Sequence, residues 1–173
     1  EVLKTVGHEN VLLVISAMGK TTNALEIVIK NYFDKSNELY ASLQDIRKYH
    51  NQILLDLFED EEHEVFFDIN AHFDDLEYFV RSNKSPNYPF VYDQIISIGE
   101  LVSTTIVSHY LNFSGISNQW LDVRQYIKTD NNYRDANVDW EDTQKLISKI
   151  NRKKSLFVTT GFIGADENNF TTT

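Results

Sequence analysis

The apolar positions near the start of the chain change from a continuous run to a helical spacing within ten residues. The run at 11–15, Val-Leu-Leu-Val-Ile, is short and rich in β-branched residues, which predicts a strand buried on both faces, as in a parallel sheet. After Gly19, apolar side chains recur every three or four positions from Leu25 to Phe33, which predicts an amphipathic helix. A polar turn over 16–23 therefore connects a strand to a helix.

Three longer helical stripes follow and make residues 36–111 a mostly helical segment. The first covers about 37–58, and the second carries apolar positions from 65 to 80. The acidic group at 59–62 is placed at the start of the second helix, where it suits the helix dipole. A loop at 82–89 ends in Pro89, which fits the first turn of a helix that reaches about Leu111.

The remaining elements complete an α/β pattern. They are a strand within 120–127, a helix that Asn137 or Asp139 caps and that ends at the basic residues 152–154, and a strand at 156–158 that leads to Gly161. The order β, four helices, β, α, β predicts an α/β domain with a largely parallel sheet. Residues 168–173 are turn-like, with no closing element, and residues 1–4 resemble the last turn of a helix, so we expect a piece of a larger protein.

Composition narrows the function classes. Apolar residues at 42% and aromatic residues at 13% of 173 positions exclude general disorder, and the length suits one domain. A net charge of −10 and a pI near 4.9 argue against a nucleic-acid partner, and an apolar run of five residues is too short to span a membrane. The absence of cysteine suits a reducing compartment, so a cytoplasmic location is expected.

The turn at 16–23, Ser-Ala-Met-Gly-Lys-Thr-Thr-Asn, is a candidate anion site. A strand leads into it and a helix leaves it, so backbone N–H groups and hydroxyls converge at a helix N-terminus. Gly19-Lys20-Thr21 resembles the end of a P-loop, but position 14 is Val where that motif needs Gly. The alternative is a plain strand–helix turn in which the hydroxyls only cap the helix.

Two further segments are candidates for chemistry. Glu100 lies in an almost wholly apolar helical stretch with small polar neighbours one turn away, so it either receives a substrate ammonium in a low-dielectric pocket or lies exposed on the helix surface. The segment 159–164 follows a predicted strand at the edge where α/β proteins bind ligands, or it is a plain glycine turn. The histidines show no zinc spacing and Asp74-Asp75 no calcium-loop pattern, so no metal site is expected.

Taken together, several segments in one order resemble the aspartate kinases of the amino-acid kinase family. These segments are 14–25, which contains Ser-Ala-Met-Gly-Lys-Thr-Thr-Asn; 98–104, Ile-Gly-Glu-Leu-Val-Ser-Thr; 120–124, Trp-Leu-Asp-Val-Arg, with Thr129-Asp130, Tyr133 and Ala136; and 160–164, Thr-Gly-Phe-Ile-Gly, with 171–173. Each motif is modest alone, but their shared order along nearly the whole chain is specific. Thr160 departs from the family, which often has Gln there.

The resemblance implies a three-layer α/β/α fold of the carbamate kinase type and transfer of the ATP γ-phosphoryl group to the β-carboxylate of L-aspartate, with Mg²⁺. This is the first step toward lysine, threonine and methionine. Carried over residue by residue, Ser16 and Thr22 would contact aspartate and Glu100 would receive its α-ammonium. Gly161 and Phe162 would lie beside the phosphoryl-transfer site.

The resemblance also implies that residues 1–173 are an incomplete catalytic domain, the amino-acid-substrate half. The family's opening Lys-Phe-Gly-Gly segment with its phosphate-binding Lys, its Arg-Gly-Gly-Ser-Asp loop and its regulatory ACT domains are absent from the sequence. We expect the chain alone to be inactive, and the full-length protein to be a homo-oligomer. Two alternatives stay open: another carboxylate or carbamate kinase of this fold, and a non-catalytic helical interaction module.

Overall fold

A parallel three-stranded sheet forms one layer of the protein. The structure is a computed structural model that describes residues 3, 5, 7–150 and 156–173. The strands are β1 (Val11–Ile15), β2 (Gln119–Leu121) and β3 (Leu156–Thr160), in the order β1-β3-β2. In the register, Ile15 is paired with Thr160 and Leu121 with Thr159, so all three strands end at one edge. The α/β class with a parallel sheet is thereby confirmed.

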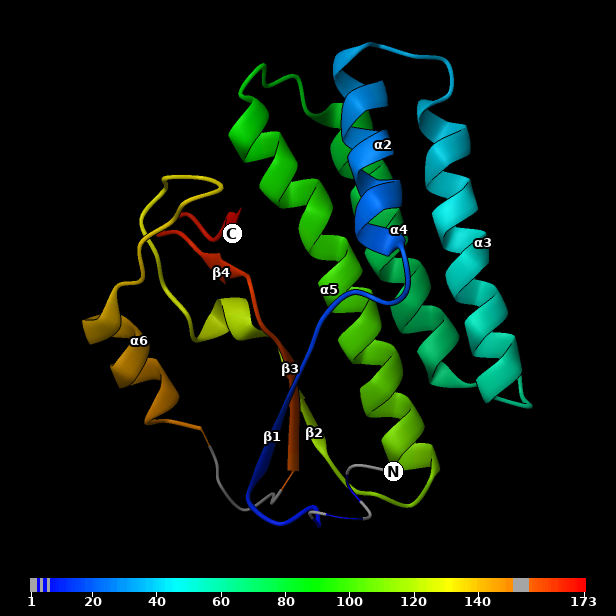
Figure 1. Cartoon of the computed structure of the whole chain (residues 1–173), viewed down its shortest axis with the longest axis vertical. Helices are drawn as coiled ribbons and strands as arrows, with labels where there is room; N and C mark the ends of the chain where they lie inside the picture. Colours follow the sequence, from blue (N-terminus) through cyan, green and yellow to red (C-terminus); the bar gives the residue numbers. More distant parts are fainter. Residues whose placement is uncertain (1–2, 4, 6, 151–155) are drawn as a thin grey trace.

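Four helices pack beside the sheet, and the longest lies between the sheet and the other three (Figure 1). They are α2 (Thr21–Phe33), α3 (Leu39–Leu57), α4 (Glu64–Ser82) and α5 (Tyr88–Phe113). Asn87 caps α5 by accepting a hydrogen bond from the Phe90 amide, and Pro89 lies in the first turn as predicted. The acidic group at 59–62 precedes α4 instead of starting it, because His63 is the capping residue.

The apolar stripes of the helices meet in one large core, and α5 forms a second, smaller core with the sheet. Leu25, Leu54, Ile69 and Ile95 are fully or almost fully buried in the helical core. The second core contains Leu111 of α5 together with two residues of β3. The helical segment is therefore packed into the same body as the sheet through α5.

One face of β1 is open, which corrects the expectation of a strand buried on both faces. Leu12 and Val14 are 56% and 59% exposed, whereas the alternate residues Val11, Leu13 and Ile15 pack against the core that contains Leu111. The pattern is the alternation of a strand with one covered face. A run of five apolar residues does not distinguish these two environments.

Two local elements differ from the predicted ones, and one predicted cap is confirmed. The strand expected within 120–127 ends at Leu121, because the Asp122 side chain accepts from the Arg124 amide and begins a 3₁₀ turn, η1 (Val123–Gln125). Residues 168–173 do contain a strand: β5 (Thr171–Thr172) pairs antiparallel with β4 (Gly164–Ala165). Asp139 caps α6 (Trp140–Ile147), as one of the two predicted residues.

Two expectations fall on residues outside the described part of the chain. The basic residues 152–154 lie wholly outside it, and of the expected helix end at 1–4 only Leu3 is described, as helical.

Helix α5 contains an 18-residue window with a mean hydropathy of 1.2, long and apolar enough to cross a membrane by composition alone. Because 78% of that window is buried inside the protein, it has the character of a core helix.

The unequal faces of the sheet predict unequal effects of two matched substitutions in the 173-residue chain. Leu156→Ala removes a fully buried side chain of β3 and is expected to cost about 2–5 kcal/mol in the free energy of unfolding. Leu12→Ala removes a side chain of neighbouring β1 that is 56% exposed and should cost under about 1 kcal/mol. Urea unfolding measures both, and equal losses would contradict the one-sided sheet.

Candidate active site

The carboxyl ends of the three parallel strands bring the predicted motifs to one edge of the sheet. Ser16 follows β1, Asp122 follows β2 and Gly161 follows β3. Helix α5 runs against this edge, and its Ser103 hydroxyl donates a 2.7 Å hydrogen bond to the Ser16 carbonyl oxygen. This is the edge at which open α/β sheets bind ligands.

Glu100 is buried at the centre of this edge, which excludes the alternative of an exposed helix-surface residue. It is 8% exposed, and its carboxylate accepts from the Ala17 amide. The Thr160 hydroxyl lies 3.4 Å from Glu100 Oε2 and 2.7 Å from the Gly161 carbonyl oxygen, so its one proton is shared and favours the nearer Gly161 carbonyl. Among the described residues, the Ala17 amide is therefore the donor that serves Glu100 alone.

The environment of Glu100 suits a cation. Burial raises the pKa of the Glu100 carboxyl, and the bonds from Ala17 and Thr160 lower it in part. Among the residues that the structure describes, no lysine or arginine forms an ion pair with it. A buried carboxylate with one dedicated hydrogen bond gains most from a ligand that supplies both positive charge and donors, which an ammonium group does.

The turn that carries Ser16 and Thr22 leads into the N-terminus of α2. Both side chains are exposed, and Lys20, the capping residue, makes no side-chain hydrogen bond to that helix end within the described part of the chain. Gly19 has a φ of +56°, and a Cβ there would lie 2.5 Å from the Tyr49 hydroxyl, so this turn requires glycine. The exposed hydroxyls and the helix N-terminus together suit a carboxylate ligand.

Gly161 and Phe162 lie directly after Thr160, on the side of the site that β3 supplies. Phe162 adopts a φ of +69° and is 64% exposed. A positive φ is uncommon for an aromatic residue, and such backbone is found preferentially at ligand sites. The structure thus brings Ser16, Glu100 and Gly161 to one edge, with Thr22 in the first turn of α2 and Phe162 exposed beside Gly161.

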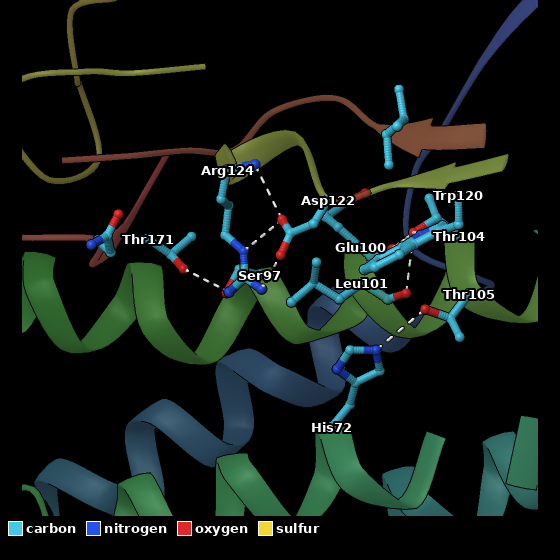
Figure 2. Close-up of polar contacts among 12 residues, drawn as sticks. His72, Ser97, Glu100, Leu101, Thr104, Thr105, Trp120, Asp122, Arg124 and Thr171 are labelled. Carbon is cyan, nitrogen blue, oxygen red and sulfur yellow. Dashed lines mark hydrogen bonds and ion pairs between the residues drawn. The ribbon is translucent and has the colours of Figure 1, made fainter. Parts of the chain in front are cut away.

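Arg124 is a residue of this edge that the sequence reasoning did not assign to the site. Its guanidinium forms a bidentate pair with Asp122, at 2.9 and 2.7 Å, and donates to the Thr171 hydroxyl at 3.3 Å (Figure 2). An arginine held in this way presents a fixed cation that can recognise a carboxylate or a phosphate. Its place after a strand end could not be predicted, because the strand expected within 120–127 contains Arg124, whereas β2 ends at Leu121.

No metal-binding group of three His, Asp or Glu side chains occurs within the described ranges. The chemistry that this edge offers is that of a buried anion, hydroxyls, backbone amides and one fixed cation.

Gly99 sets how closely α5 approaches the turn at 16–22. A Cβ at this position would lie 3.1 Å from Ala17 Cβ and 3.2 Å from Thr21 Cγ2. We expect Gly99→Ala to lower the free energy of unfolding by about 1–3 kcal/mol through overpacking, despite the better helix propensity of alanine. Urea unfolding tests this, and a variant as stable as the wild type would show that the contact is not tight.

Comparison with known proteins agrees with the motifs at this edge. The model of the Amino acid kinase family matches residues 2–172. The bifunctional aspartokinase/homoserine dehydrogenase 2 of Escherichia coli (strain K12) is 28% identical over 155 residues, which cover 88% of this chain and 19% of that protein. The lysine-sensitive aspartokinase 3 of the same organism is 31% identical over 90 residues, 49% of this chain and 20% of that protein.

Solved structures extend the similarity to the fold. Escherichia coli aspartokinase III in complex with lysine and aspartate, in the T-state, gives a TM-score of 0.86 at 25% identity, covering 99% of this chain and 39% of that chain. The same enzyme in complex with aspartate and ADP, in the R-state, gives a TM-score of 0.81 over 94% of this chain and 36% of that chain. The chain spans only about a fifth of the length of the curated relatives that it matches. With a family match along nearly its whole length, this chain belongs to the Amino acid kinase family, and the relatives that it resembles are aspartokinases.

Proposed function

We propose that this chain is the amino-acid-substrate half of an aspartate kinase catalytic domain. The complete protein would transfer the γ-phosphoryl group of ATP to the β-carboxylate of L-aspartate and form 4-phospho-L-aspartate, the first step toward lysine, threonine and methionine. The observation that carries the proposal is the buried carboxylate of Glu100 at the sheet edge, which forms an ion pair with no lysine or arginine among the described residues. The aspartokinase relatives support it, and one of them was solved with aspartate and ADP.

In this proposal each group of the site holds one part of aspartate. Glu100 receives the α-ammonium, whose charge and N–H donors complete its hydrogen bonding. Ser16, Thr22 and the N-terminus of α2 form one anion-binding group, and Arg124 supplies a fixed cation for a carboxylate. Gly161 and Phe162 lie beside the position of phosphoryl transfer. Such a reaction depends mainly on positioning and charge stabilisation.

The phosphate-binding groups of the reaction are assigned to the complete protein. The sequence contains neither Lys-Phe-Gly-Gly nor Arg-Gly-Gly-Ser-Asp, the segments that hold ATP in the family that it resembles. Mg²⁺ would enter with ATP and neutralise phosphate charge. A cytoplasmic location and a homo-oligomeric complete protein remain part of this proposal.

The test is ATP-dependent hydroxamate formation by the complete polypeptide, with L-aspartate, L-glutamate and N-acetylglutamate as acceptors. We expect activity on aspartate that collapses in Glu100→Ala, because the substrate ammonium loses its counter-ion. The 173-residue chain alone should form no aspartyl phosphate, because the phosphate-binding segments are missing. Activity by the chain alone would overturn its assignment as a half-site.

The acceptors separate this proposal from its alternatives. A preference for glutamate or acetylglutamate would replace it with another kinase of the same fold. Activity on none of the three would favour the non-catalytic interaction module. Aspartate activity that survives in Glu100→Ala would keep the enzyme class and remove Glu100 from the ammonium site.

The raised pKa of Glu100 predicts how aspartate binding depends on pH. Only the ionised carboxylate pairs with the ammonium, so the KM for aspartate should rise as pH falls from neutrality toward that raised pKa. The aspartate β-carboxyl titrates near pH 3.9 and stays ionised over most of this range. Glu100→Gln should raise the KM about a hundredfold and flatten its pH dependence. Steady-state kinetics between pH 5 and 8 would refute this if the variant kept the wild-type slope.

A further inference from the structure

Helix α3 contacts the turn at 16–22, here called the acceptor loop, through two adjacent residues. The Tyr49 hydroxyl occupies the space where a Cβ of Gly19 would lie. The His50 Nε2 lies 3.3 Å from the Thr21 hydroxyl. The two rings pack edge to face with their centroids 5.0 Å apart. A helix of the 36–111 segment therefore touches the acceptor loop at both Gly19 and Thr21.

The hydrogen bonds of His50 have one consistent assignment. Its Nδ1 lies 2.9 Å from the Ile46 carbonyl oxygen, which can only accept, so Nδ1 carries the proton. The ring is fully buried, and burial lowers its pKa, so it is neutral at pH 7. Nε2 then holds a lone pair, and the Thr21 hydroxyl must donate to it. The His50 ring also packs against Phe73 of α4, at a centroid distance of 5.6 Å.

Thr21 is held on two sides. Its hydroxyl bonds to His50, and its methyl carbon lies 3.2 Å from the Cβ position of Gly99, the residue before Glu100. Thr21 is itself 3% exposed and is the first residue of α2. Because Thr22 follows it directly, the direction of the Thr22 hydroxyl depends on how Thr21 is anchored. His50 thus acts on the acceptor loop through Thr21.

We propose that His50 and Tyr49 of α3 position the acceptor loop, so that the helical segment 36–111 sets the affinity of the site for its amino-acid substrate. His50 is a positioning residue and touches no reacting atom. The inference rests on the proposed function for the identity of the substrate, whereas the anchoring of the loop stands on the contacts alone.

The test uses the complete polypeptide and two variants that break one hydrogen bond from its opposite ends. His50→Phe keeps an aromatic ring and removes the acceptor, and Thr21→Val keeps the methyl group and removes the donor. Each should raise the KM for L-aspartate about tenfold, with the KM for ATP and kcat changed less than about twofold. The double variant should be no worse than either single one, since both remove the same bond.

Two matched variants serve as controls. His50→Gln retains an acceptor near the position of Nε2 and should restore the KM to within about threefold of wild type. Ser42→Ala removes a different side-chain hydrogen bond between α2 and α3, the 3.2 Å bond to Asn31, and should leave the KM for aspartate unchanged. Equal rises of both KM values in His50→Phe and Thr21→Val would indicate a merely structural role and overturn the proposal.

Hydrogen–deuterium exchange separates the failure of this inference from the failure of the proposed function. Amides 19–24 should exchange faster in both variants than in wild type, whereas those of α4 should not. Faster exchange without any aspartate activity in the wild type would overturn the proposed substrate and keep the anchor. Unchanged exchange together with an unchanged KM for aspartate would overturn the anchor in an active kinase. Thr21→Val keeps the test decisive if His50→Phe does not fold.

Discussion

The burial of α5 is the constraint on which the rest of the structure depends. Sixteen of its 26 residues are buried, and they include seven polar or charged ones. Polar groups in such a position cost stability unless they are hydrogen-bonded, so each must find a partner. Some of these partners lie in other elements: Ser103 donates to the Ser16 carbonyl, 87 residues away, and Trp120 of β2 donates to Thr104.

Two buried carboxylates on this helix connect the two ends of the candidate active site. Glu100 accepts from the Ala17 amide at the acceptor loop. Asp93, seven residues earlier and about two turns away, accepts from the Thr173 amide at 2.9 Å and the Thr173 hydroxyl at 2.7 Å. Burial raises the pKa of both carboxyls. Helix α5 therefore fixes the spacing between the acceptor loop and the segment 171–173, which resembles the approach to a phosphate-binding loop.

The helices could be predicted from the sequence because their apolar stripes are long and periodic. The N-terminal cap of α6 could also be predicted, because Asp139 was one of the two capping residues expected from the sequence. The two-residue strands β4 and β5 are too short to show a periodic pattern. Strand β2 is shorter than predicted because the Asp122 side chain accepts a hydrogen bond from the Arg124 amide. The exposure of Leu12 and Val14 depended on which face the helices cover, which a run of apolar residues does not encode.

The candidate site was predictable in its parts but not in its arrangement. The chain order of the motifs pointed to Ser16, Thr22, Glu100 and the turn at Gly161. Whether Glu100 was buried could not be decided, because its surroundings come from Ala17 and Thr160, which are 83 and 60 residues away in the chain. Arg124 and His50 could not be assigned to the site for the same reason. Their partners, Thr171 and Thr21, are brought next to them only by the fold.

Glu100 is proposed to bind the α-ammonium of the acceptor at the carboxyl edge of the sheet. A crystal structure of the complete polypeptide with L-aspartate would test this role directly. We expect the α-ammonium nitrogen about 2.7–3.2 Å from a Glu100 carboxylate oxygen, with the carboxylates of aspartate toward the acceptor loop and Arg124. Aspartate bound at this edge with its ammonium away from Glu100, or bound elsewhere on the protein, would show that Glu100 does not have this role.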